Sequence, residues 1–180
     1  MKKKIVVITG SPRKNGNSFA MTDAFIKAAE KKGHCIMRYD AADMEIKGCT
    51  ACESCLETEN ACIFDDDFNR MAPVIEEADV VILTTPLYWY TFPAKLKAVI
   101  DKFFALYVRK RAIGNKECAL MVCCAGEIEC MEGISFAYKQ TIELMEWKSV
   151  KEILVPSVNM PGDIYKTDGI AQAEMLADLL

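Results

Sequence analysis

Residues 5–18 read Ile-Val-Val-Ile-Thr-Gly-Ser-Pro-Arg-Lys-Asn-Gly-Asn-Ser, and this stretch decides the fold. Its first five residues form a β-branched run, which is typical of a strand that is buried on both faces of a parallel sheet. A polar loop with two glycines follows. From Asn17 the apolar residues recur at helical spacing until Lys31-Lys32-Gly33. The stretch therefore predicts a strand, a glycine-containing loop and a helix.

The same alternation continues along the chain. We predict further strands over 35–39, 80–84, 119–123 and 150–155, and helices over 68–77, from Pro93, over 131–146 and from Asp168. The helix from Pro93 is expected to place Phe103 and Phe104 on its apolar face. Strands that alternate with helices need right-handed crossovers in a parallel sheet. The prediction is an α/β, three-layer flavodoxin-like sandwich: one domain over 1–180, with a five-stranded sheet in the order 2-1-3-4-5.

Composition excludes several classes of protein. The chain has 180 residues and a net charge of −4, which gives no basic surface for nucleic acid. No segment approaches the roughly 20 apolar residues that span a bilayer, and the apolar run after Lys2–Lys4 is too short for a signal peptide. We therefore expect a cytoplasmic protein whose nine cysteines stay reduced. His34 is the only histidine in the sequence, so a Ser-His-Asp or Cys-His triad of a hydrolase would have to include it.

The loop over 10–18 is a candidate phosphate site. In the predicted sheet, the loops after Thr9 and Thr84 meet at the topological switch point, where ligands of such folds bind. A phosphate there meets the N-terminus of a helix and polar side chains from Ser11, Asn17 and Ser18, while Arg13 adds a charge. The alternative is a polar connection in which Asn17 only caps the helix. The loop is neither a Walker loop nor a dinucleotide glycine motif.

The loop over 85–93 is unusually aromatic for a surface connection. It contains Tyr88, Trp89, Tyr90 and Phe92 within five positions. Aromatic side chains at the carboxyl edge of a sheet suit a flat ring ligand such as a flavin. Phe92 and Tyr90 have an alternative role, which is to cover the core or an interface between subunits.

Both loops resemble motifs of the NADPH-dependent FMN reductase family. Gly-Ser-Pro-Arg-Lys-Asn-Gly-Asn-Ser resembles its phosphate loop, and Pro-Leu-Tyr-Trp-Tyr-Thr-Phe-Pro-Ala-Lys-Leu-Lys resembles its second motif. The resemblance implies FMN as cofactor, NAD(P)H as electron donor and a third flavin contact at a turn near 126, although Glu127 and Glu129 depart from the family's pattern there. The residues implied to bind the phosphate are Ser11, Arg13, Asn17 and Ser18; those implied to contact the flavin ring are Pro86, Leu87, Tyr88, Trp89 and Gly126.

A cysteine-rich insert over about 43–66 separates the second strand from the next helix. It contains Cys49-x2-Cys52-x2-Cys55-x6-Cys62, a spacing that suits four thiolate ligands of a [4Fe-4S] cluster better than a zinc ion. Structural thiols, a redox disulfide or an adventitious metal are the alternatives. From Asp43 to Asp67 the chain has eight acidic residues and one basic residue, Lys47; this negative charge would lower the potential of a cluster, or the segment would form a solvated lid.

The insert resembles the cysteine motif of iron-sulfur flavoproteins, which implies a cluster near the FMN of a homodimer. Two functions follow. The first is NAD(P)H-dependent reduction of a flavin, quinone or similar acceptor, and the second is electron transfer between partner proteins. A flavin-binding sensor or scaffold is a third reading without specific support. The partner is thus a small-molecule acceptor or a redox protein, and the sequence assigns no catalytic acid or base.

Overall fold

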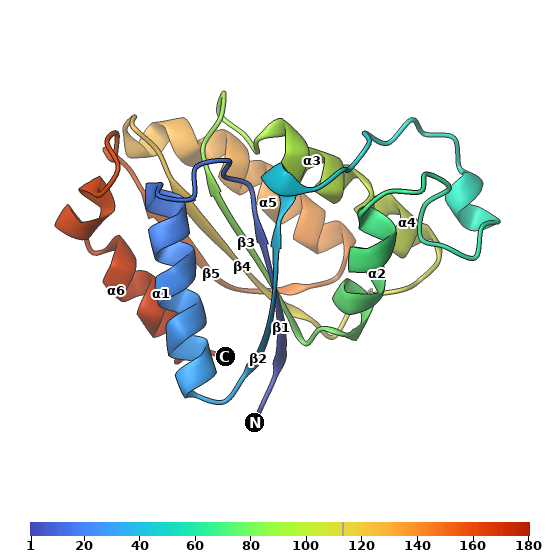
Figure 1. The fold of residues 1–180 in the computed structure, drawn as a ribbon, viewed down its shortest axis with the longest axis horizontal. Coiled ribbons are helices and arrows are strands. Elements are labelled where there is room, and N and C mark those ends of the chain that lie inside the picture. The colour runs from blue at the N-terminus through green and yellow to red at the C-terminus, as the bar shows by residue number, and fades with distance from the viewer. Residues whose placement is uncertain (113) are drawn as a thin grey trace.

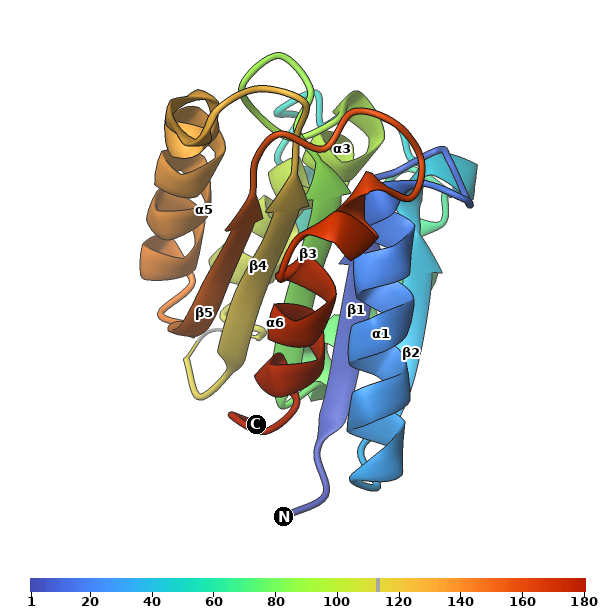
Figure 2. The same ribbon diagram turned by 90° about the vertical axis from the view of Figure 1, so that its left-hand side faces the viewer.

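The structure is a computed structural model that describes residues 1–112 and 114–180. The described residues form five strands, which pair only in parallel and lie in the order β2-β1-β3-β4-β5 (Figure 2). This order confirms the predicted flavodoxin-like sheet. The strands are β1 (Lys4–Thr9), β2 (Cys35–Asp40), β3 (Val80–Pro86), β4 (Glu117–Cys123) and β5 (Lys148–Val155).

Helices cover both faces of the sheet (Figure 1). One face carries α1 (Asn17–Lys31) and α6 (Gly169–Leu176). The other face carries α2 (Phe68–Glu77), α3 (Ala94–Asp101), α4 (Phe103–Val108) and α5 (Glu132–Leu144). Short 3₁₀ helices occupy four of the described connections: η1 (Ala41–Asp43), η2 (Ser54–Leu56), η3 (Ile128–Met131) and η4 (Asp163–Lys166).

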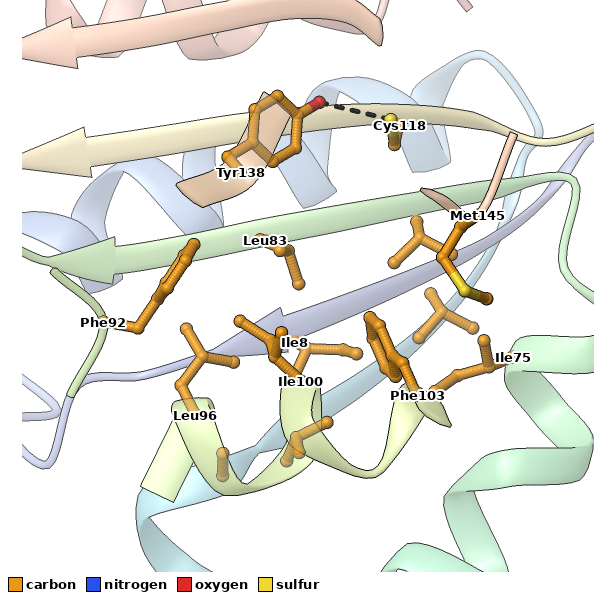
Figure 3. Packing of buried hydrophobic residues seen from close by; sticks show 14 of the residues in the cluster. Ile8, Ile75, Leu83, Phe92, Leu96, Ile100, Phe103, Cys118, Tyr138 and Met145 are labelled. Carbon is orange, nitrogen blue, oxygen red and sulfur yellow. Dashed lines mark hydrogen bonds between the residues drawn. The ribbon is translucent and has the colours of Figure 1, made fainter. Parts of the chain in front are cut away.

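Two apolar clusters hold these layers together because successive strand residues point to opposite faces. Val6 and Ile8 of β1 pack toward α2–α5, whereas Ile5 and Val7 pack toward α1 and α6. Figure 3 shows the first cluster, in which Tyr138 also places its hydroxyl 3.2 Å from the sulfur of Cys118. A strand with both faces buried must be apolar throughout, which explains the β-branched run over 5–8.

One predicted helix is divided in two. The helix expected from Pro93 ends at Asp101, and α4 begins at Phe103 after a break at Lys102. Phe103 is buried, but Phe104 is 42% exposed, so the prediction that both share the core face was wrong. At the break, the Lys102 side chain is buried and pairs with Asp66.

The cysteine-rich insert extends beside α2 and α4, away from the layer of α1 and α6 (Figure 1). Asn69 at the start of α2 holds its end, because the Asn69 side chain accepts a hydrogen bond from the Cys62 N–H (2.7 Å) and donates to the Cys62 carbonyl (3.0 Å). Among the described helices, none is long and apolar enough to cross a membrane.

Candidate functional site

A cleft of about 180 Å³ opens at the carboxyl ends of the central strands, where the topological switch point predicts a ligand. Loops after β1, β3, β4 and β5 form its walls. Seven of the nine predicted flavin-binding residues line it. The complete lining is Ser11, Arg13, Gly16, Asn17, Ser18, Pro86, Leu87, Tyr88, Cys123, Cys124, Ala125, Val158, Asn159 and Pro161.

The loop after β1 is a tight turn that its own hydrogen bonds stabilise. The Ser11 hydroxyl oxygen accepts the Arg13 N–H (3.1 Å), and the Gly16 N–H donates to the Arg13 carbonyl (3.0 Å). Gly10 is required where the loop leaves the sheet, because a Cβ atom there would lie 2.5 Å from the Thr85 hydroxyl oxygen. The backbone at Gly10 therefore packs closely against the end of β3, and the hydrogen bonds of the loop fix the path of the chain into α1.

The N-terminus of α1 opens into this cleft without a cap. Its N-cap residue is Gly16, no side chain accepts a hydrogen bond from the first turn, and that turn contains no acidic residue. The first N–H groups of a helix lack intrahelical acceptors and carry a partial positive charge. The cleft therefore presents oriented donors to an anion, beside the side chains of Ser11, Arg13 and Ser18.

Asn17 has a role that the sequence did not indicate. Its amide donates to the Met160 carbonyl (3.0 Å), and its side-chain oxygen accepts the Gly162 N–H (3.0 Å). The side chain thus fastens the loop after β5 to α1 instead of capping the helix. That loop supplies Val158, Asn159 and Pro161 to the cleft, and sequence reasoning missed it. The sequence did contain a signal that this loop belongs to the cleft, because β5 also ends at this edge of the sheet and a Pro-Gly turn follows.

The aromatic loop divides into residues that line the cleft and residues that do not. Pro86, Leu87 and Tyr88 line it, while Phe92 is 4% exposed and belongs to the core, as its alternative role predicted. Trp89 is 91% exposed and lies outside the lining. The contact of Trp89 with a flavin stays a prediction.

The tip of this loop has a strained backbone. Trp89 and Tyr90 have φ values of 45° and 64°, a left-handed conformation that is uncommon for large side chains. Two hydrogen bonds of 3.0 Å between Tyr88 and Thr91 close the turn. Gly133 of α5 allows its close approach, because a Cβ atom there would lie 2.7 Å from the Tyr90 carbonyl oxygen. The fold thus holds an aromatic tip rigidly beside the mouth of the cleft.

The end of β4 contributes Cys123 to the cleft, the loop after it contributes Cys124 and Ala125, and Gly126 lies just beyond them. Gly126 instead makes room for Cys130, whose sulfur would lie 2.9 Å from a Cβ atom at that position. Burial raises the pKa of the Cys123 thiol to about 12. This thiol is therefore neutral at physiological pH and contributes an apolar surface, not a nucleophile.

A second cavity, of about 30 Å³, brings together all four cysteines of the insert: Cys49, Cys52, Cys55 and Cys62. Hydrogen bonding from the Ser54 N–H lowers the pKa of the exposed Cys52 thiol, whereas burial raises that of Cys55. Within the described part of the chain, no three His, Cys, Asp or Glu side chains converge on a position for a single metal ion. The thiols share a cavity but stand apart from one another.

The fold is flavodoxin-like, and its cleft lies at the switch point of the sheet, where the N-terminus of α1 opens. The family model for NADPH-dependent FMN reductases matches residues 3–155, and the chain belongs to this family.

Among curated proteins, the chain is similar to iron-sulfur flavoproteins. It is 37% identical to one from Archaeoglobus fulgidus over 99 residues, which cover 55% of this chain and 44% of that protein. It is 32% identical to one from Methanosarcina thermophila over 113 residues, or 63% of this chain and 59% of that protein. The chain thus spans about half the length of the curated relatives it matches.

Solved structures show the same fold at low sequence identity. An NAD(P)H:quinone oxidoreductase from Methanothermobacter marburgensis superposes with a TM-score of 0.77 at 18% identity, covering 98% of this chain and 95% of that one. The azoreductase AzrA gives 0.78 at 15% identity, covering 98% and 100%.

Proposed function

We propose that this chain is an FMN-dependent oxidoreductase that takes electrons from NAD(P)H and passes them to a flavin, quinone or similar acceptor. One observation carries the proposal: the uncapped N-terminus of α1 opens into a cleft that Pro86–Tyr88 also line. Helix N–H donors and apolar, aromatic side chains in one cleft fit a ligand with a phosphate at one end and a flat ring at the other. Membership of the FMN reductase family supports FMN as that ligand.

Each wall of the cleft has a distinct task in this proposal. The backbone N–H groups of Asn17 and Ser18, with the side chains of Ser11, Arg13 and Ser18, hold the phosphate. Pro86, Leu87 and Tyr88 pack against the ring, and Asn17 acts through its side chain by keeping the 158–161 loop in place. When bound, FMN supplies the hydride chemistry, while the chain orients it and excludes water on the buried side.

The second candidate function is electron transfer by an iron-sulfur flavoprotein. The gathering of Cys49, Cys52, Cys55 and Cys62 around one cavity favours it, together with the curated relatives of that name. A [4Fe-4S] cluster takes four cysteine thiolates, each on a different iron.

We also propose an assembly and a location for the protein. The cleft is open and has an exposed aromatic tip at its mouth, so a second subunit that covered it would complete the site. We therefore propose a homodimer, and we place it in the cytoplasm. Its partner is a small-molecule acceptor or a redox protein. The net charge of −4 argues against nucleic acid.

Purification without oxygen tests these functions together. The reductase predicts flavin absorption that NADPH bleaches rapidly and that returns when a quinone is added. The carrier predicts, in addition to flavin, about four irons per chain and exchange of electrons with a redox protein in the absence of NADPH. A colourless protein that does not take up added FMN would contradict both.

A further inference from the structure

A buried lysine lines the four-cysteine cavity together with the thiols. The side chain of Lys102, at the break between α3 and α4, is 1% exposed and forms an ion pair with Asp66, whose side chain is 2% exposed. Lys102 lines the cavity with the four cysteines, and Asp66 does not. The cation is therefore part of the cavity wall, and its counter-ion is not.

Asp66 is held in place by the backbone of the insert. Its Oδ2 atom accepts the Lys47 N–H (2.9 Å) as well as the Lys102 ammonium, and its Oδ1 atom accepts the Phe68 N–H (3.1 Å). Three donors therefore fix the carboxylate in place. The ammonium also lies 5.4 Å from the centre of the Phe64 ring, which packs in the same wall.

Packing alone does not account for this arrangement. Removing two charges from water is unfavourable, and apolar residues of similar volume commonly replace a buried ion pair without loss of stability. A cluster with four thiolates is anionic, so a fixed cation beside it favours the addition of an electron. The other charged residue on the cavity wall, Glu53, is exposed and screened by solvent.

We propose that Lys102 is a positioning residue for the cysteine site: its ammonium, fixed by Asp66, sets the reduction potential of the iron-sulfur cluster above the value that the acidic insert would otherwise give. The inference rests on the cluster proposed above. It also revises the effect expected from the acidic insert, because one of those acids serves to orient a buried cation.

The test compares charge variants of the whole chain after anaerobic reconstitution. The readouts are iron and sulfide per chain, and the midpoint potential of the cluster followed by EPR. Lys102→Met should lower the potential, Asp66→Asn should raise it, and Lys102→Arg should keep it near the wild-type value. Lys97→Met is the matched control, since Lys97 is an exposed residue of α3 that pairs with Asp101 on the surface, and it should leave the potential unchanged.

Removing one charge of a buried pair can prevent folding, so the double variant Lys102→Met with Asp66→Asn removes both charges together. The proposal predicts that this variant folds, binds iron and has a lowered potential. Equal potentials in wild type and double variant, or shifts of the same sign in Lys102→Met and Asp66→Asn, would overturn the role of Lys102. A wild-type chain that binds no iron would overturn the cluster itself, and iron content separates that result from the other.

Discussion

Arg13 and Lys14 are adjacent cations with different surroundings. Arg13 lines the cleft beside the α1 N-terminus, whereas Lys14 points away and pairs with Asp43 at 2.9 Å on the surface. A charge-assisted hydrogen bond contributes roughly 1.5–3 kcal/mol. Because Arg13 is exposed, we expect the lower end of that range: Arg13→Ala should weaken FMN binding about tenfold, measured by quenching of flavin fluorescence. Lys14→Ala is the control, and an equal loss in both variants would contradict a specific role for Arg13.

Lys116 is a buried cation with a structural task. Its ammonium donates to the carbonyls of Glu76 (2.8 Å) and Ala78 at the end of α2, and burial lowers its pKa. Lys116→Met keeps the apolar stem but leaves these carbonyls without a donor. We expect a loss of about 1–3 kcal/mol in the free energy of unfolding, measured with urea at neutral pH. Lys27→Met, on the exposed face of α1, should change it by less than about 0.5 kcal/mol; similar losses in both variants would refute this role.

At the scale of elements, the sequence pattern predicts the structural features that depend on residues close together in the chain. The buried strands, the loops at the switch point and the membership of Phe92 in the core follow from local composition and from the topology of parallel sheets. The burial of Lys102 does not, because its partner Asp66 lies 36 residues away in the sequence. The bond from Asn17 to Met160 spans 143 residues, so the role of that side chain was equally invisible. Trp89 is placed outside the cleft by a backbone turn that no residue in it favours.

Strand β4 makes stability sensitive to alkaline pH. Burial raises the pKa of Cys118 to about 11 and that of Cys123 to about 12, from an ordinary value of 9.0. Above about pH 9 the unfolded chain releases these protons while the folded chain keeps them, so stability present below pH 9 is lost as pH rises toward 11 and 12. The slope is at most about 1.4 kcal/mol per pH unit for each thiol. Urea unfolding across this range should show a shallower fall for Cys118→Ala with Cys123→Ala than for wild type, and parallel curves would contradict the assignment.

For the whole molecule, the fold brings two separate sites to one domain. Four loops meet at the carboxyl edge of the sheet and form the cleft, while the insert between β2 and α2 forms the cysteine cavity against α4. The order of strands and helices was predictable because crossover handedness leaves few arrangements. The spacing of the four cysteines could suggest, but not establish, that their thiols share one cavity. The loop after β5 could not be assigned to the cleft from the sequence, because Asn17 holds it there through contacts between distant residues.

The central claim is that the N-terminus of α1 holds the phosphate of FMN. Titration of the flavin-free chain with FMN and with riboflavin tests it directly, because the two ligands share the ring and differ in the phosphate. Two charge-assisted hydrogen bonds of about 1.5 kcal/mol each predict that FMN binds roughly 100-fold more tightly than riboflavin. Equal affinities for the two ligands would contradict the claim, since the ring would then bind without any contribution from the loop over 10–18.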